Sequence, residues 1–129
     1  MAETASPFAG DGPERQFRAG LAAGEFKIQH CGGCGKYVFY PRALCNHCGS
    51  PNLAWETASG DGTVYSTTIE RYKPEAGGDK NIAVVELAEG PRLLTRITDI
   101  APAEVKIGMT VKAHIGEAEG IKMILFRKA

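Results

Sequence analysis

The sequence lacks long hydrophobic runs. Its longest apolar stretches, such as Ile82–Val85 and Met123–Phe126, are far shorter than the roughly 20 residues that span a bilayer. The first residues, MAETASPFAGDG, have neither the cationic start nor the apolar core of a signal peptide. We therefore expect a cytoplasmic protein with no membrane partner, in a compartment where thiols stay reduced.

An excess of charge is also missing. The 15 basic and 15 acidic side chains cancel, so no net field draws the protein to nucleic acid. Segment 26–55 has three basic residues and no acidic one, but a zinc ion with four thiolates would carry −2 and leave about +1 there. We therefore expect no nucleic-acid partner, although a single-stranded nucleic-acid-binding module remains an alternative function.

The motifs of several enzyme classes do not occur. The sequence has no Walker motif, no GxSxG elbow, no HExxH and no glycine-rich dinucleotide fingerprint. Its acidic residues are scattered, and no pair is placed as an acid/base couple. His114 lies in an expected strand and is interpreted as an exposed strand residue rather than a general base. The chain by itself is therefore expected not to be an enzyme.

What the sequence does have is a cluster of cysteines. All four lie within residues 31–48, in two CxxC pairs, each followed by a glycine that permits the positive φ of a tight knuckle. Two facing knuckles can place four thiolates around zinc, about 2.3 Å from the metal, with no open position for water or substrate. The expected ligands of this structural zinc site are Cys31, Cys34, Cys45 and Cys48.

Other interpretations of the cysteines fit less well. Iron is the alternative metal, but rubredoxins use nearly the whole chain for their site, whereas most of this chain lies elsewhere. Two disulfides would suit a secreted protein, and a thioredoxin-like site needs only one CxxC. His30 and His47 flank the cluster and are expected to be surface neighbours. With all four thiols used, no cysteine is left as a nucleophile.

The order of elements predicts a mainly β protein. Residues 1–13 are expected to be loosely ordered, residues 14–56 to hold a short helix and a zinc ribbon, and residues 57–129 to form a barrel. Phe17 and Leu21, four residues apart, predict the helix over 14–23. A strand is expected at 26–29, a β-prone run at 36–40 and a turn at 60–62.

The second half of the chain predicts five strands with a helical turn at 102–105 between the third and the fourth, which is the outline of an OB-fold. The expected strands are 63–72, 81–87, 93–98, 110–116 and 121–127. Aromatic residues and arginine are good anchors at interfaces, so Tyr40, Arg42 and Trp55 are candidates for a partner surface. For Trp55 the alternative is packing between ribbon and barrel.

These segments together resemble the small proteins of domain-of-unknown-function family thirty-five, in which a rubredoxin-like zinc ribbon is joined to an OB-fold. The resemblance covers nearly all of residues 15–128 and rests on pieces that occur in order. They are the Phe17–Leu21 helix, KIQHCGGCGKYVFYPRALCNHCGS, WETASGDGTVYSTTI, VVELAEGPRLLTRI, VKIGMTV and MILFRKA.

The resemblance implies a function. Members of that family commonly act as small partners of thiolase-like enzymes or of acyl-CoA hydratase and aldolase systems, in which the large subunit holds the catalytic residues. The family's metal ligands correspond to the four cysteines of this chain. We therefore expect a non-catalytic zinc-binding accessory subunit that docks on a thiolase-type catalytic subunit and supports its acyl-CoA site; the sequence leaves open whether it contacts acyl-CoA directly or only through that subunit.

Overall fold

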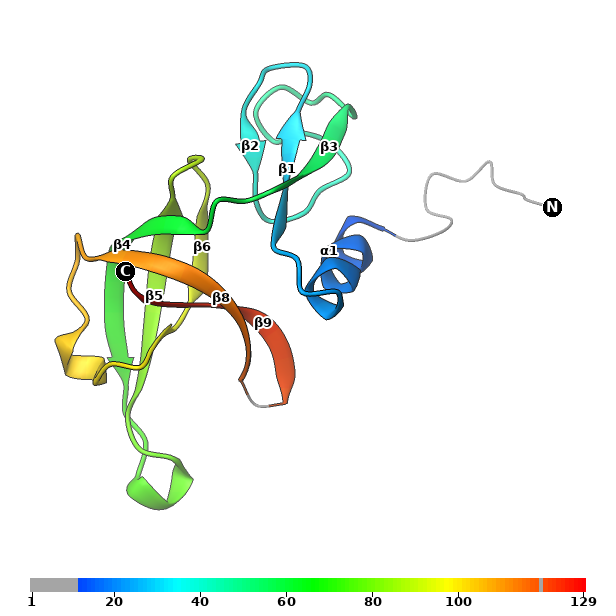
Figure 1. The fold of residues 1–129 in the computed structure, drawn as a ribbon. Helices are drawn as coiled ribbons and strands as arrows, with labels where there is room; N and C mark the ends of the chain where they lie inside the picture. Colours follow the sequence, from blue (N-terminus) through cyan, green and yellow to red (C-terminus); the bar gives the residue numbers. More distant parts are fainter. Residues whose placement is uncertain (1–11, 119) are drawn as a thin grey trace. The chain divides into compact units, whose positions relative to one another are not determined.

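The computed structural model describes residues 12–118 and 120–129, and the chain forms two compact units that meet in sequence between Ala58 and Ser59 (Figure 1). Residues 1–13 were expected to be loosely ordered, and residues 1–11 of this segment lie outside the described residues. No helix among the described residues is long and apolar enough to cross a membrane.

The first unit consists of a helix and a three-stranded antiparallel sheet. Helix α1 (Pro13–Ala22) starts with proline, whose missing N–H costs nothing in the first turn, and is followed by Gly24 at a left-handed φ of 83°. The predicted helix is confirmed, and Leu21 is its buried residue. The sheet has the order β2-β1-β3, with bounds β1 (Lys27–Cys31), β2 (Tyr37–Val38) and β3 (Leu53–Thr57).

Long loops make up much of this small unit. The β-prone run at 36–40 forms only the two residues of β2, because the chain must leave the sheet to reach the second cysteine pair. The small core consists of Cys31, Val38 and Cys45, with Leu53 packed against it. Two of the four cysteines are therefore part of the hydrophobic core of the ribbon.

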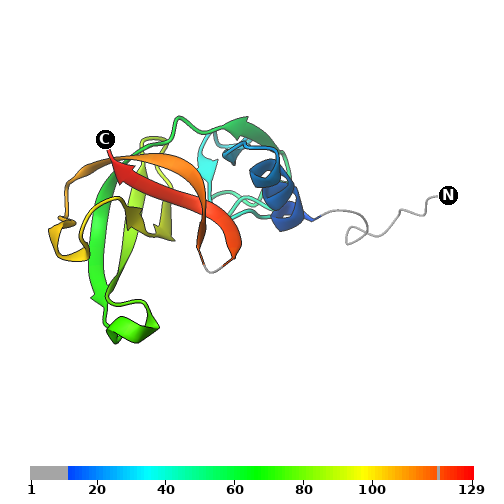
Figure 2. The same cartoon turned by 60° about the horizontal axis from the view of Figure 1, so that its bottom comes forward.

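The second unit is a sheet of six strands with the order β6-β5-β4-β8-β9-β7. Its strands are β4 (Asp61–Glu70), β5 (Lys80–Leu87), β6 (Arg92–Thr95), β7 (Ile97–Thr98), β8 (Thr110–Ala118) and β9 (Ile121–Lys128). Two short 3₁₀ helices, η1 (Pro74–Ala76) and η2 (Pro102–Glu104), lie in its loops. Figure 2 shows β8 and β9 running side by side as a long hairpin.

The sheet closes into a barrel because the third predicted strand is divided in two. Segment 93–98 was expected to form one strand, but it pairs first with β5 through β6 and then, in parallel, with β9 through β7. Arg96 stands at the change of partner, where its carbonyl accepts a hydrogen bond of 3.1 Å from the Phe126 N–H. Since β6 and β7 end the strand order on opposite sides, this single residue joins the two edges.

The barrel core follows from strict alternation in β5, where every second residue from Asn81 to Leu87 is buried. The face that carries Ala83, Val85 and Leu87 is therefore the buried one. The predicted turn at 60–62 is shorter than expected, because Gly62 already lies within β4. A Cβ at Gly62 would lie 2.6 Å from Val85 Cγ1, so this strand position requires glycine.

Candidate metal centre

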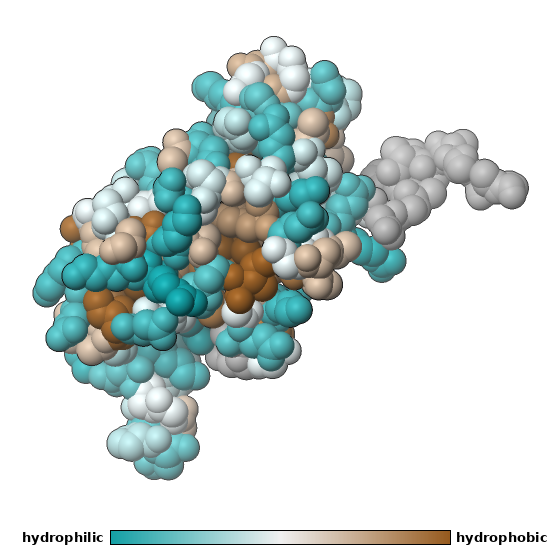
Figure 3. Space-filling model, in the orientation of Figure 1, coloured by the Kyte–Doolittle hydropathy of each residue, from teal (hydrophilic) through white to brown (hydrophobic). Residues whose placement is uncertain are grey.

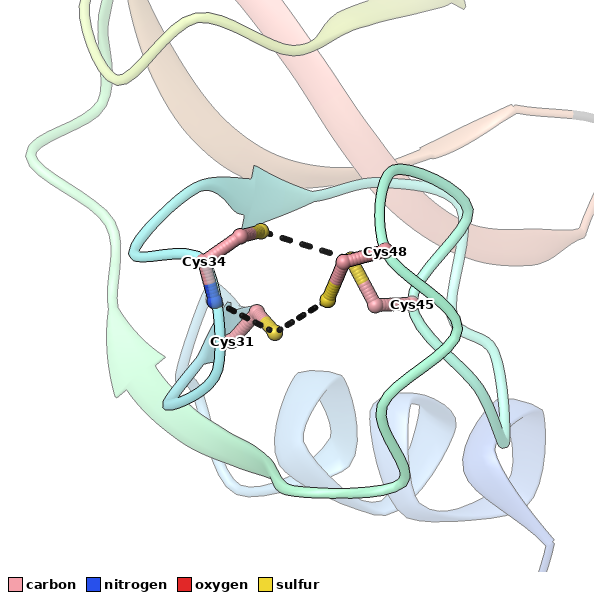
Figure 4. Close-up of side chains that lie close together, drawn as sticks. All are labelled: Cys31, Cys34, Cys45 and Cys48. Carbon is pink, nitrogen blue, oxygen red and sulfur yellow. Dashed lines mark hydrogen bonds between the residues drawn. The ribbon is translucent and has the colours of Figure 1, made fainter.

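The four cysteines come together from two loops of the first unit. Cys31 ends β1 and Cys34 lies in the turn that follows, whereas Cys45 and Cys48 lie in the long loop between β2 and β3. Figure 4 shows the side chains of the two pairs facing each other. All four sulfur atoms lie within 4.8 Å of one another.

The sulfur positions fit a tetrahedral metal ion. Cys31 Sγ lies 3.6 Å from Cys48 Sγ, and Cys34 Sγ lies 3.7 Å from Cys45 Sγ. Four sulfurs at about 2.3 Å from a central zinc form a tetrahedron with edges of about 3.8 Å. The two distances are therefore those of ligands that share one ion, and the donor set of four thiols suits zinc or iron. The four cysteines can therefore hold one metal ion.

The backbone of each pair forms a tight knuckle. Gly35 and Gly49 adopt φ values of 79° and 81°, and their N–H groups donate to the carbonyls of Cys31 and Cys45. Three further N–H groups point at sulfur: those of Gly33 and Cys34 at Cys31 Sγ, 3.3 and 3.4 Å away, and that of His47 at Cys45 Sγ, 3.3 Å away. Such donors stabilise thiolates, the form that binds metal.

The pKa values of the cysteine thiols reflect these contacts with backbone N–H groups and neighbouring sulfurs. The hydrogen bond from the Cys34 backbone lowers the pKa of Cys31 to about 6. Burial opposes ionisation of Cys45, but hydrogen bonds from the backbone of His47 and Cys48 outweigh it and lower the Cys45 pKa. The Ser50 backbone favours the Cys48 thiolate, yet the Cys31 sulfur beside it raises the pKa of Cys48 to about 11. The Cys31 sulfur thus opposes ionisation of its neighbour Cys48, and a metal ion bound to both would favour the thiolate form of each.

The two neighbouring histidines differ in their surroundings. Both ring nitrogens of His30 have protein partners: Nδ1 lies 2.6 Å from Glu56 Oε2, and Nε2 donates to the Gly35 carbonyl at 3.0 Å. The hydrogen bond to Glu56 raises the pKa of His30. The side chain of His47 is exposed on the second knuckle, to which it contributes its backbone N–H.

The three candidate interface residues also lie in the first unit. Tyr40 is 51% exposed, and its ring is 4.6 Å from that of Phe39. Arg42 is exposed, and Gln29 binds its backbone. Trp55 is half-buried and donates its indole N–H to Gln16 of α1 at 2.6 Å, so it links the helix to β3.

Sequence reasoning overlooked Gln29 and Glu56. Both are polar residues on short strands, and no local pattern separates them from ordinary surface positions. Gln29 is nevertheless 3% exposed, and Glu56 reaches back 26 residues to His30. The antiparallel pairing of β1 with β3 sets His30 opposite Ala54 and so brings Glu56 within reach of His30. Gln29 meets Arg42 through the path of the loop that follows β2.

His114 differs from its prediction, since it is half-buried rather than exposed. The ring lies beside Gly116, where a side chain would approach His114 Cε1 to 3.3 Å, and its Nε2 is 2.9 Å from Thr98 Oγ1. Burial, together with the charge of Arg127, lowers the pKa of His114. Its hydrogen-bonding partner is a hydroxyl, which cannot serve as the carboxylate of an acid/base couple.

Comparison with known proteins agrees with this architecture. Two family models match consecutive parts of the chain: the rubredoxin-like zinc ribbon domain of ChsH2 over residues 18–54, and the C-terminal OB-fold domain of ChsH2 over residues 55–116. Together the two models reach from within α1 to β8.

Three relatives of known name are similar in sequence. A probable enoyl-CoA hydratase alpha subunit of Thermomonospora curvata is 37% identical over 107 residues, which are 79% of this chain and 33% of that protein. A DUF35 domain-containing scaffold protein of Pyrococcus furiosus is 40% identical over 81 residues, 60% of each chain. One of Methanocaldococcus jannaschii is 36% identical, over 64% of this chain and 62% of its own length. This chain thus spans about a third to three fifths of the length of these relatives.

Two solved structures are matched by this chain over a larger share of their own length than the three sequence relatives are. A structure described as an Ltp2-ChsH2(DUF35) aldolase has a TM-score of 0.78 and 30% identity, and covers 93% of this chain and 97% of its own. A DUF35 protein of Sulfolobus solfataricus has a TM-score of 0.65 at 22% identity, covering 88% and 83%, and shows the same fold. A zinc ribbon and an OB-fold in this order, matched by both family models, establish that the chain belongs to the DUF35 family.

Proposed function

We propose that this chain is a non-catalytic, zinc-binding accessory subunit of an acyl-CoA enzyme, and that it docks on a thiolase-type catalytic subunit and supports its acyl-CoA site. The observation that carries the proposal is the gathering of all four cysteines into one cluster. Thiolase chemistry needs a cysteine nucleophile, and this chain has none outside that cluster. In a thiolase complex its role is therefore structural.

The proposal assigns zinc to Cys31, Cys34, Cys45 and Cys48. Four thiolates close the coordination sphere, so the metal stabilises the ribbon and performs no chemistry on a substrate. The small core of the ribbon supports this role, because it includes Cys31 and Cys45 and would lose much of its packing if the loops separated.

A rigid, exposed loop of the ribbon is the proposed docking surface. Tyr40 and Leu44 are 51% and 55% exposed, and Arg42 lies between them. The loop is part of an aromatic cluster, since the Phe39 ring contacts the Tyr40 ring and also meets the Phe17 ring of α1 edge-on, with centroids 5.4 Å apart. A preorganised loop loses little entropy on binding, which favours its use as an anchor. Trp55, the third candidate residue, links β3 to α1 through its hydrogen bond with Gln16.

The barrel surface supports a protein partner rather than a nucleic acid. Four of its basic side chains form ion pairs with carboxylates: Arg71 with Asp79, Arg92 with Glu86, Lys112 with Asp61 and Arg127 with Asp99. Hydrophilic side chains cover most of the face seen in Figure 3, with separate hydrophobic patches between them. Such interspersed charges do not make the continuous basic groove that single strands need.

An open cavity of about 360 Å³ lies in the barrel unit. Its lining contains a single ionisable side chain, Arg71, which already pairs with Asp79 at 2.7 Å. The lining therefore offers no pair of groups for acid/base catalysis, in keeping with a supporting role.

A hydratase or an aldolase is the second candidate for the catalytic subunit. The names of two relatives support it, since one is a probable enoyl-CoA hydratase alpha subunit and another belongs to an aldolase. The proposals share the accessory role and differ only in the reaction of the large subunit.

The test is affinity purification of the tagged protein from its own cells, followed by mass spectrometry, absorbance at 260 nm and assay of the eluate for thiolysis, hydration and aldol cleavage of acyl-CoA. A stoichiometric thiolase-type partner whose activity falls when this chain is removed supports the proposal. A hydratase or aldolase partner replaces the thiolase assignment. Nucleic acid without a protein partner, or turnover of acyl-CoA by the purified chain alone, overturns the accessory role.

A further inference from the structure

A cluster of polar side chains lies directly beside the metal centre. His30 precedes Cys31 in β1, and its ring stacks on that of Tyr37 in β2, with centroids 4.3 Å apart and an angle of 12° between the planes. Glu56 of β3 bridges the two: one carboxylate oxygen is 2.6 Å from His30 Nδ1, and the other accepts the Tyr37 hydroxyl at 3.2 Å. The cluster thus joins all three strands of the ribbon.

The same cluster reaches into the first knuckle. His30 Nε2 donates to the carbonyl of Gly35, the glycine that completes the turn after Cys34. The N–H of Gly35 donates to the Cys31 carbonyl, and the Cys31 N–H donates to Lys36. The position of the Gly35 peptide therefore fixes how the loop carrying Cys34 folds back over Cys31, and His30 ties that peptide to the sheet.

The second knuckle has no equivalent residue in sequence. Its backbone hydrogen bonds repeat those of the first, with Gly49 N–H to Cys45 and Cys45 N–H to Ser50. The residue that corresponds to His30, immediately before the first cysteine of the pair, is Leu44. Leu44 has no polar side-chain atom and is 55% exposed. A hydrogen-bonding side chain before the first cysteine is thus not required to form a knuckle. The contacts of His30 therefore add a constraint that the second knuckle does not have from Leu44.

We propose that His30 is a positioning residue for the metal, and that Glu56 and Tyr37 orient its ring. By holding the Gly35 carbonyl, His30 keeps Cys34 in place to bind, and a metal ion leaves the site more slowly. This inference rests on the proposed zinc site and goes beyond it, because it assigns a metal-retaining role to three residues that are not ligands. Groups that orient ligands commonly change metal affinity by roughly 10- to 100-fold.

The experiment uses the full chain loaded with zinc and measures the rate of zinc transfer to a chromogenic chelator. His30→Phe keeps a flat ring next to Tyr37 but removes both hydrogen bonds, and Glu56→Gln removes the negative charge that orients the ring. Each is expected to release zinc about tenfold faster. Glu25→Gln is the matched control, because Glu25 is an exposed carboxylate of the same unit that pairs with Lys27 at 3.5 Å.

A second readout separates positioning from general stability. Cobalt in place of zinc reports the ligand geometry through its visible absorption, which a change in stability alone does not move. Altered cobalt spectra and faster zinc release in His30→Phe and Glu56→Gln, with Glu25→Gln unchanged, support the inference. Variants that keep the original spectrum and release rate overturn it while leaving the zinc site intact. An unsubstituted chain that binds no metal overturns the zinc proposal itself.

Discussion

The side-chain amide of Gln29 makes two hydrogen bonds with the backbone of Arg42. Nε2 donates to the Arg42 carbonyl and Oε1 accepts the Arg42 N–H, both at 2.8 Å. This pair resembles the hydrogen bonds between strands, except that a side chain replaces one backbone. Gln29 and His30 are consecutive in β1 and point to opposite faces of the sheet. One strand therefore holds both loops, since His30 binds the first knuckle and Gln29 the segment that leads to the second.

Replacing Gln29 by leucine is expected to destabilise the first unit by about 1–3 kcal/mol, because the Arg42 N–H and carbonyl lose their partly buried hydrogen bonds with this buried side chain. Chemical denaturation followed by Trp55 fluorescence measures the change. The control is Gln16→Leu, which removes the exposed hydrogen bond between α1 and Trp55 and should cost less. Equal stability of Gln29→Leu and the unsubstituted protein would show that water replaces both hydrogen bonds.

Replacing Cys34 or Cys45 by serine is expected to release the metal and unfold the ribbon, since binding free energy at such a site is folding free energy. The measurements are zinc content and circular dichroism of the purified variant, together with binding of the catalytic subunit. Removal of zinc from the unsubstituted protein by a strong chelator should have the same effects. If metal content, spectrum and partner binding all survived the substitutions, the structural role of the site would be wrong.

Truncation of Tyr40 or Arg42 to alanine is expected to weaken binding of the catalytic subunit by about 1–2 kcal/mol each, roughly tenfold in Kd, because exposed aromatic and arginine side chains on a rigid loop act as anchors. Titration calorimetry with the isolated partner measures the change. Tyr72→Ala is the control, since Tyr72 is a 41% exposed tyrosine of the barrel unit. Unchanged affinity in both ribbon variants would place the docking surface elsewhere.

The stability of the barrel is expected to fall in mild acid because of His114. Burial first, and then the charge of Arg127, lower its pKa in the folded state. The unfolded chain therefore takes up a proton at higher pH than the folded one, so stability is full above the ordinary histidine pKa of about 6.5 and is lost as the pH falls through the lowered value. Asp99, whose charge acts in the opposite direction, limits the size of the effect.

The check for His114 is the pH dependence of the free energy of unfolding, compared between the unsubstituted chain and His114→Gln. The variant should lose less stability than the unsubstituted chain between about pH 7 and pH 5. The comparison between the two proteins cancels the contribution of His30, whose raised pKa has the opposite sign. Parallel pH profiles would show that His114 titrates alike in the folded and unfolded chains.

The sequence by itself determined the features that depend on local order. The two CxxC pairs, each with its glycine, are enough to predict which four side chains gather, because a knuckle is a property of a few consecutive residues. Alternation in β5 likewise predicts which side chains share a face, since successive side chains of a strand must point to opposite sides. The same local signals indicated the helix at the start of the first unit.

Only the tertiary structure decided the features that join distant segments. The break at Arg96 arises because one stretch of chain must pair with β5 and then with β9, and periodicity within the stretch contains no information about its partners. His30 meets Glu56, and Gln29 meets Arg42, across 26 and 13 residues. A polar residue on a short strand has many possible partners, and the register of the sheet and the path of the loops select one of them.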